Sequence, residues 1–166
     1  AGKIALENNI NPVVKYVSGG ICNMKISTKG RYAIRVMIDL AEHNTGEYIP
    51  LMDIAGRQEI SEKYLESIVA VLSKNDLLIS LRGKGGGYKL ARQPQEYKIG
   101  DILRLTEGSF APVACLEKKP NQCTRAVGCK TLQMWEGFQK VMEDYFDNIT
   151  IADLVNDDQG ADNYVI

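Results

Sequence analysis

A glycine-rich segment at residues 82–87 constrains the fold of this chain more than any other feature. The runs on either side, residues 77–81 and 88–90, have the apolar and β-branched or aromatic composition of short strands. Glycine-rich loops also cradle nucleotide phosphates, but here no helix follows the glycines and no Gly-Lys-Ser/Thr sequence is present. The segment therefore predicts a β-hairpin with a narrow tip that carries Arg82 and Lys84.

Three helical segments precede this hairpin. Residues 27–42 repeat apolar side chains at helical spacing, at Ile34, Met37, Ile38 and Ala41. Pro50 stands at the entry of a short second helix, which continues through Leu51, Ile54 and Ala55. Ser61 is a predicted N-cap for a third helix.

The third helix divides into an apolar and a polar face. The apolar stripe consists of Leu65, Ile68, Val69 and Leu72. The opposite face is small or polar, and consists of Lys63, Glu66, Ser67, Ala70 and Lys74. Helix, helix, turn, helix and hairpin is the order of a winged helix-turn-helix, in which such a face reads base edges and the helix N-terminus binds phosphate. The simpler alternative is a small α/β domain in which the glycines only close a turn.

The remaining chain completes a fold that is mainly α with a small β-hairpin. We divide it into a leader or extension outside the fold (1–23), a winged helix-turn-helix domain (24–92), a connecting helix (93–109), a cysteine-bearing loop (110–129), a dimerisation helix region (130–155) and an acidic flexible tail (156–166). The long helix predicted at residues 130–148 has a stripe too apolar to face water alone, formed by Met134, Phe138, Val141, Met142, Tyr145 and Ile149.

Charge is unevenly distributed along the chain. The net charge is −1, and it alone indicates no polyanionic partner. Residues 24–92, however, hold eleven Lys/Arg against eight Asp/Glu, whereas residues 93–166 hold seven against twelve. This asymmetry favours a polyanion-binding region beside an acidic module, although a solvated charged face is the alternative. No apolar run is long enough to span a membrane and no secretory leader opens the chain, so we expect a cytoplasmic protein without a membrane partner.

Three cysteines lie close together before the long helix. Cys115, Cys123 and Cys129 are separated by seven and five residues. An odd number of thiols in a reducing compartment is poor material for disulfides, whereas thiolates are good ligands for iron–sulfur clusters and zinc. The alternative is reduced cysteines without a ligand role. We do not expect an enzyme, because the single histidine, His43, lies in the other domain and no nucleophile has a base beside it.

Three motifs together resemble one group of bacterial winged-helix repressors. They are Met24-Lys25-Ile26-Ser27-Thr28-Lys29-Gly30-Arg31-Tyr32-Ala33, then Ile60-Ser61 to Tyr64-Leu65-Glu66, and then Arg82-Gly83 to Gly86-Gly87-Tyr88. The group includes the iron–sulfur cluster regulator, the nitric-oxide-sensing repressor and the cysteine-metabolism repressor. The resemblance implies a homodimer that binds a pseudo-palindromic site in double-stranded DNA. It also implies that Glu66 faces bases, that Arg82 enters the minor groove, and that Lys29, Arg31 and Tyr32 lie near the DNA backbone.

The resemblance also implies a cofactor at Cys115, Cys123 and Cys129. Iron–sulfur members carry three cysteines in this position, so a cluster is expected here, [2Fe–2S] in preference to [4Fe–4S], with zinc as the alternative. The fourth ligand is unassigned. Where the iron–sulfur cluster regulator has a histidine this chain has Leu132, and Arg31 stands near the place of an acidic ligand of the nitric-oxide-sensing branch. We recruit neither His43 nor Cys22.

The last residues resemble the end of the cysteine-metabolism repressor. Tyr164, Val165 and Ile166 finish an acidic segment with an aromatic residue and a terminal isoleucine. In that repressor such an end is thought to engage O-acetylserine sulfhydrylase. The resemblance therefore implies a second hypothesis, a cysteine-metabolism repressor controlled through its tail, with the cysteines as zinc ligands or thiol sensors. An unstructured solubilising tail is the alternative.

Overall fold

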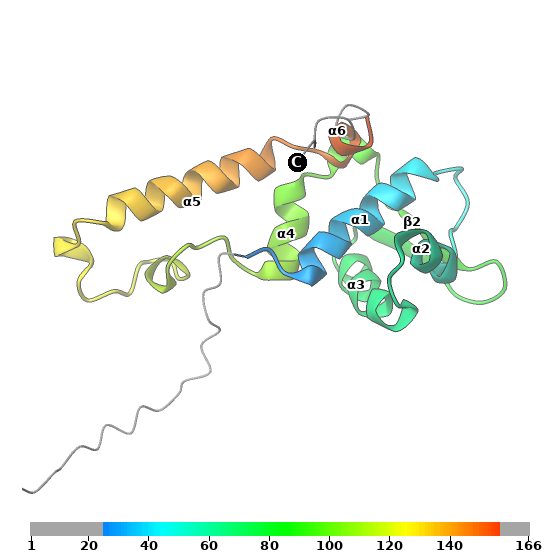
Figure 1. Ribbon diagram of the computed structural model, residues 1–166, viewed down its shortest axis with the longest axis horizontal. Coiled ribbons are helices and arrows are strands. Elements are labelled where there is room, and N and C mark those ends of the chain that lie inside the picture. Colours follow the sequence, from blue (N-terminus) through cyan, green and yellow to red (C-terminus); the bar gives the residue numbers. More distant parts are fainter. Residues whose placement is uncertain (1–24, 157–166) are drawn as a thin grey trace, which may run out of the picture.

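Three helices and a hairpin form the first half of the fold, and a projecting helix distinguishes the second (Figure 1). The computed structural model describes residues 25–156, so the leader, Cys22 and the tail residues Tyr164, Val165 and Ile166 lie outside it. The elements are α1 (Thr28–Glu42), α2 (Leu51–Gln58), α3 (Glu62–Lys74), β1 (Leu78–Leu81), β2 (Gly87–Leu90), η1 (Pro94–Glu96), α4 (Ile99–Glu107), η2 (Ala114–Leu116), η3 (Ala126–Gly128), α5 (Leu132–Asp147) and α6 (Ile151–Val155). This confirms the predicted class, mainly α with a small hairpin.

Helix α1 is the centre of the core. Ser27 is its N-cap, and the Ser27 hydroxyl accepts a hydrogen bond from the Gly30 N–H at 3.1 Å. Helices α2, α3, α4 and α6 all pack against it. Its fully buried apolar side chains are Ala33, Val36, Met37 and Leu40. The helix predicted from the spacing of Ile34, Met37, Ile38 and Ala41 is thus confirmed. Met37 is part of this core, and Ile34, Ile38 and Ala41 are partly buried and pack against it.

The helix-turn-helix follows from local stop signals. Pro50 is the N-cap of α2 and Glu59 is its C-cap, with a φ of 54° that lies in the left-handed region. The Ile60 N–H then donates to the Ala55 carbonyl, and Ser61 begins α3 as its N-cap without a capping hydrogen bond from its side chain. The predicted apolar stripe of α3 is confirmed, because Leu65, Ile68, Val69 and Leu72 are all buried.

The hairpin is the wing of this fold. β1 and β2 are antiparallel, with Leu78 opposite Leu90 and Leu81 opposite Gly87. Gly83 and Gly85 close the turn with φ of 96° and 75°, a conformation that residues with a Cβ rarely adopt. Ile49 adds a third, short partner, since its N–H donates to Tyr88 and its carbonyl accepts from Tyr88. The wing is thus tied along one side to the segment before α2.

The helices of the second half fall inside the expected segments, and two of them pack on the first half. Helix α4 was expected to be a connecting helix, yet Ile99, Ile102 and Leu103 are buried in the same core as α1. The region at 130–155 is two helices, because Thr150 forms a capping box with Asp153 and starts α6, which packs back on α1. Helix α5 and the segment that precedes it extend away from the body (Figure 1). Among residues 25–156, no helix is long and apolar enough to cross a membrane.

Candidate nucleic-acid interface

The polar face of α3 is open to solvent. Its five residues are all exposed, as the predicted division of this helix into an apolar and a polar face requires: Lys63, Glu66, Ser67, Ala70 and Lys74. The opposite stripe is buried, so the polar face is held in one orientation by the core. Glu66 and Lys63 lie in the first two turns of α3, the part of a recognition helix that contacts base edges. A carboxylate there can accept a hydrogen bond from the amino group of cytosine.

Aromatic side chains connect α1 to the start of α3. The rings of Tyr32 and Tyr64 meet edge to face, with centroids 5.8 Å apart. The Arg35 guanidinium lies 5.3 Å from the Tyr32 centroid. Arg31 is exposed and donates a hydrogen bond to the Thr28 hydroxyl. The first turns of α1 and α3 are therefore packed together, which places the predicted backbone contacts beside the predicted base contact.

The tip of the wing carries two exposed cations, Arg82 and Lys84. Neither has an ion-pair partner among residues 25–156, so both guanidinium and ammonium groups are available to phosphate or a narrow groove. At the side of the wing, the Lys89 ammonium lies 4.6 Å from the centroid of the Tyr48 ring. The tip is thus a slim, positively charged projection.

A buried ion pair, which sequence reasoning missed, holds α2 against α1. Asp39 is fully buried, and its two carboxylate oxygens accept hydrogen bonds from Arg57 at 2.9 and 2.6 Å and from the Gln58 amide at 2.9 Å. Burial raises the pKa of Asp39, but the hydrogen bonds from Arg57 and Gln58 and the charge of Arg57 outweigh it, so the pKa is lowered. The sequence signal for this pair is an acidic residue, Asp39, within the apolar run from Val36 to Leu40. No sequence signal marks Arg57, its partner on another helix.

Arg35 extends this network to the helix-turn-helix. Its guanidinium donates to the Gln58 side-chain oxygen at 2.9 Å and to the Gln58 carbonyl. His43, expected to be an ordinary surface residue, ends α1 with its Nδ1 2.8 Å from the Asp39 carbonyl oxygen. These contacts fix the end of α2, and hence the turn that leads into α3.

The three cysteines lie in the segment between α4 and α5. Each is a free thiol; Cys115 and Cys123 are half-buried and Cys129 is exposed. The Cys123 N–H donates to the Asn121 side-chain oxygen at 2.8 Å. Hydrogen bonds from the Thr131 hydroxyl and from the Thr131 and Leu132 backbone N–H groups lower the pKa of Cys129, which favours its thiolate.

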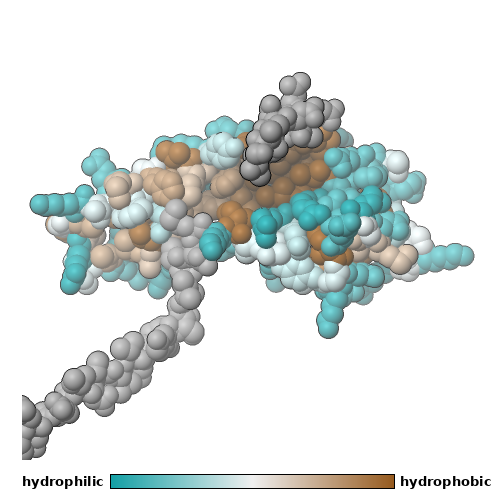
Figure 2. All heavy atoms as spheres, viewed as in Figure 1, coloured by the Kyte–Doolittle hydropathy of each residue, from teal (hydrophilic) through white to brown (hydrophobic). Residues whose placement is uncertain are grey.

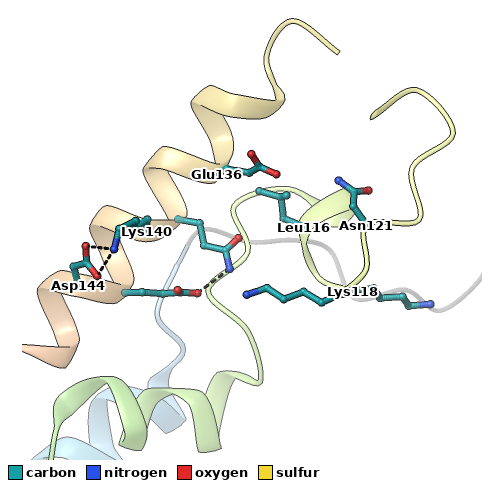
Figure 3. Close-up of a pocket in the computed structure, with 9 residues that line it drawn as sticks. Leu116, Lys118, Asn121, Glu136, Lys140 and Asp144 are labelled. Carbon is teal, nitrogen blue, oxygen red and sulfur yellow. Dashed lines mark hydrogen bonds and ion pairs between the residues drawn. The ribbon is translucent and has the colours of Figure 1, made fainter. Parts of the chain in front are cut away.

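The expected grouping of the cysteines is not present in the described part of the chain. Within residues 25–156, no three His, Cys, Asp or Glu side chains lie together as a metal-binding group. A cavity of about 420 Å³ does separate the cysteine segment from α5; it is lined by Leu116, Lys118, Lys119, Asn121, Glu136, Gln139, Lys140, Glu143 and Asp144 (Figure 3). The Asn121 amide nitrogen is buried there without a hydrogen-bond partner. The segment is thus incompletely packed on α5.

Helix α5 exposes four of the six residues of the predicted apolar stripe, whereas Met142 and Ile149 are half-buried and Ile149 packs against the core beyond the end of α5. Met134, Val141 and Tyr145 are 56%, 65% and 64% exposed, and Phe138 is also exposed. Brown, apolar atoms gather along this helix and its junction with the body (Figure 2). The base of α5 is anchored to α4, where the Arg104 guanidinium donates to the Asp147 carboxylate at 2.6 Å, and this hydrogen bond lowers the pKa of Asp147.

Comparison with known proteins identifies relatives along most of the chain. The sequence model of the Rrf2 family, which is described as an iron-dependent transcriptional regulator, matches residues 26–157. Protein rrf2 of Nitratidesulfovibrio vulgaris is 38% identical over 134 residues, which cover 81% of this chain and 89% of that protein.

Two solved structures are similar as well. IscR of T. potens has a TM-score of 0.64 at 40% identity, over 83% of this chain and 90% of that one. CymR, the global cysteine regulator of B. subtilis, has a TM-score of 0.64 at 34% identity, over 79% of this chain and 95% of that one.

Proposed function

The chain belongs to the Rrf2 family of transcriptional regulators, and we propose that it acts as a homodimeric repressor whose operator binding is tuned at its three cysteines. The relatives are regulators and not enzymes, which confirms the expectation that this chain is not an enzyme. The observations that carry the proposal are the exposed polar face of α3 and the exposed cations at the tip of the wing. A helix in the major groove and a wing in the minor groove use these two surfaces at once.

The residues divide the work of binding DNA. Glu66 and Lys63 face base edges in the major groove, and the N-terminus of α3 at Ser61 binds a phosphate. Arg82 and Lys84 enter or flank the minor groove, where negative potential is concentrated. Lys29, Arg31 and Tyr32 contact the backbone from α1. The DNA that a bacterial transcriptional regulator binds lies in the cytoplasm, so we place the protein there.

Two copies assemble through α5. The four exposed apolar residues Met134, Phe138, Val141 and Tyr145 follow one another at spacings of four, three and four, the pattern of an a/d seam. A second copy of α5 covers this stripe and places two α3 helices on one DNA molecule. The operator is then pseudo-palindromic, because its two halves face two copies of the same surface.

We assign Cys115, Cys123 and Cys129 as ligands of an iron–sulfur cluster, [2Fe–2S] in preference to [4Fe–4S]. The donor chemistry of three free thiols fits such a group, although their separate positions require the segment to rearrange. When bound, the cluster supplies a redox-sensitive charge. The IscR of T. potens, at 40% identity, supports this assignment by its name.

A direct contact connects the end of α4, which precedes the cysteine segment, to the start of α1. Glu107, the last residue of α4, accepts hydrogen bonds from the Ser27 N–H at 3.3 Å and from the Ser27 hydroxyl at 2.7 Å. Ser27 caps α1, whose first turns bear Lys29, Arg31 and Tyr32. A rearrangement of the segment that follows α4 therefore acts on the start of α1, and operator affinity changes with the state of the cysteines.

Anaerobic purification followed by a visible absorption spectrum with iron and sulfide analysis tests the cofactor. We expect a coloured protein, and we expect Cys123→Ala to lose the colour while its helical circular dichroism stays unchanged. Cys22→Ala is the matched control and keeps the colour, because Cys22 is not among the proposed ligands. A coloured Cys123→Ala protein would remove Cys123 from the ligand set.

The likeness to B. subtilis CymR and the lowered pKa of the exposed Cys129 thiol favour a second candidate function. In this alternative the protein is a cysteine-metabolism repressor, its cysteines are thiol sensors or zinc ligands, and its end binds O-acetylserine sulfhydrylase. Deletion of Tyr164, Val165 and Ile166 should then abolish capture of purified O-acetylserine sulfhydrylase. Undiminished capture by the shortened protein, or a coloured protein that does not bind the enzyme at all, would contradict the alternative.

A further inference from the structure

Tyr97 has a buried hydroxyl whose hydrogen bonds join two separate parts of the wing. The residue is only 2% exposed. Its hydroxyl accepts a hydrogen bond from the Arg92 N–H at 2.7 Å and donates one to the Leu77 carbonyl at 2.9 Å. Both polar functions of the group are thus satisfied in the interior, where an unpaired hydroxyl would be costly.

These two partners are the two ends of the wing. Leu77 directly precedes β1, and Arg92 follows β2, so the Tyr97 hydroxyl closes the hairpin at its base. The Arg92 guanidinium also lies over the Tyr97 ring, 5.0 Å from its centroid. A two-stranded ribbon has little rigidity of its own and twists easily. The direction of its tip therefore depends on how its base is held.

The backbone of Tyr97 is held by the segment between α5 and α6. The Ile151 N–H donates to the Tyr97 carbonyl at 3.0 Å, and the Ile99 N–H donates to the Ile149 carbonyl at 2.9 Å. Lys98 pairs with Thr150 in an isolated antiparallel bridge. Tyr97 thus joins the wing to the segment that directly follows α5, the helix proposed to carry the dimer contact.

We infer that Tyr97 is a positioning residue for the wing, which sets where Arg82 meets the DNA. The inference rests on the proposed DNA contact of Arg82. Tyr97 touches no DNA itself; its hydroxyl fixes both strand ends against the core, and its backbone fixes them relative to α5. In a dimer, this joint sets the position of each wing relative to the shared helix pair.

The ring of Tyr97 fills the core whether or not the hydroxyl is present, so Tyr97→Phe isolates the clamp from the packing. The variant folds, because the ring volume is unchanged and the Leu77 carbonyl keeps a hydrogen bond from the Ala91 N–H at 3.2 Å. Tyr48→Phe is the matched control. Tyr48 is another tyrosine beside the wing, half-buried where Tyr97 is buried, and its hydroxyl has no hydrogen-bond partner among residues 25–156.

The test is a double-mutant cycle on affinity for a DNA site selected by the wild-type dimer. We expect Arg82→Ala to weaken binding about tenfold and Tyr97→Phe to weaken it roughly three- to tenfold, the range of one net hydrogen bond. In the Arg82→Ala background, Tyr97→Phe should have almost no further effect. In a Glu66→Ala background it should keep its full effect, and Tyr48→Phe should leave the affinity unchanged in each background. Hydroxyl-radical footprints of the Tyr97→Phe protein should lose protection only at the wing's positions.

Each other outcome overturns a defined statement. An effect of Tyr97→Phe that is equally large with and without Arg82 would mean general destabilisation and would overturn the inference, as would unchanged affinity of Tyr97→Phe itself. An Arg82→Ala protein that binds like wild type would instead overturn the proposed contact of the wing with DNA, and the positioning role would fall with it.

Discussion

The two halves of this molecule differ in what their side chains leave unsatisfied. In the winged-helix half, the buried carboxylate of Asp39 is fully paired with Arg57 and Gln58, and the core side chains of α1 and α3 are fully enclosed. In α5 no residue is buried, and an apolar stripe faces outward. The cysteine segment beside it leaves a cavity and an unpaired amide. The first half encloses its apolar core and leaves only the Ser73 hydroxyl buried without a partner among residues 25–156, whereas α5 leaves a whole apolar stripe for another component to cover.

The largest effect should come from a charge placed in the α5 stripe. We expect Val141→Glu to yield a monomer by sedimentation and to lower operator affinity by roughly 10²–10⁴-fold, the gain that linking two half-site contacts provides. Because Val141 is 65% exposed, the stability of the winged-helix half should not change. Gln133→Glu adds the same charge to an exposed position of α5 outside the stripe and should remain dimeric. A dimeric Val141→Glu protein would contradict the difference between the halves.

Substitution of the exposed face of α3 should act on sequence choice. Glu66→Ala should reduce discrimination at one operator position by about 1–3 kcal/mol, the range of one base contact, while the protein remains folded. Arg82→Ala should weaken binding to all sequences with less effect on preference. Competition binding against operators with single base changes measures both. Identical preference profiles for wild type and Glu66→Ala would remove Glu66 from the base contacts.

Loss of the buried carboxylate should act on stability. Asp39→Asn should lower the free energy of unfolding at pH 7 by roughly 2–3 kcal/mol, since Arg57 loses its ionic partner but is a third exposed and can reach water. The pKa of Asp39 is lowered in the fold, so its contribution is present above the ordinary value of 3.8 and is lost as pH falls through the folded pKa. Denaturant unfolding at several pH values should therefore show the two proteins begin to converge as pH falls below about 4 and become equal only below the folded pKa of Asp39.

The smallest effect should come from an ion pair on α5. The Lys140 ammonium lies 2.8 Å from Asp144 on the helix surface, and both side chains are exposed. Solvent screens such a pair, so Lys140→Ala should leave the unfolding midpoint unchanged. Comparison with Asp39→Asn separates an ion pair that holds two helices together from one that decorates a single helix. A large loss of stability in Lys140→Ala would mean that α5 is more tightly integrated into the fold than its exposure indicates.

Local patterns predicted the elements well because each has a local cause. Ser27, Pro50 and the glycines of the wing start, stop or turn the chain through their own backbone preferences, and the stripe of α3 needs only helical spacing. The spacing along α1 predicted the helix, but it did not show which of its sides are buried. Its burial depends on neighbours that are distant in sequence, and α4 and α6 cover sides of α1 that an amphipathic pattern treats as solvent-facing.

The functional residues divide in the same way. The exposure of Glu66 follows from helical spacing, and that of Arg82 follows from its place at the tip of a hairpin, so both were predictable. The contacts of Asp39 with Arg57 and of Tyr97 with Leu77 join residues far apart in the chain, and no spacing rule announces them. The three cysteines show the converse case, since proximity in sequence predicted a ligand group that the fold of residues 25–156 does not assemble.

Selection of DNA sites from a random pool by the purified dimer tests the central claim most directly. We predict enrichment of one pseudo-palindromic sequence whose two halves lie on one face of the DNA about one helical turn, or a multiple of it, apart. The Glu66→Ala protein should relax the same positions in both halves. Recovery of a single unpaired half-site would contradict the dimeric arrangement. A recovered pool in which no sequence is enriched would contradict sequence readout by α3.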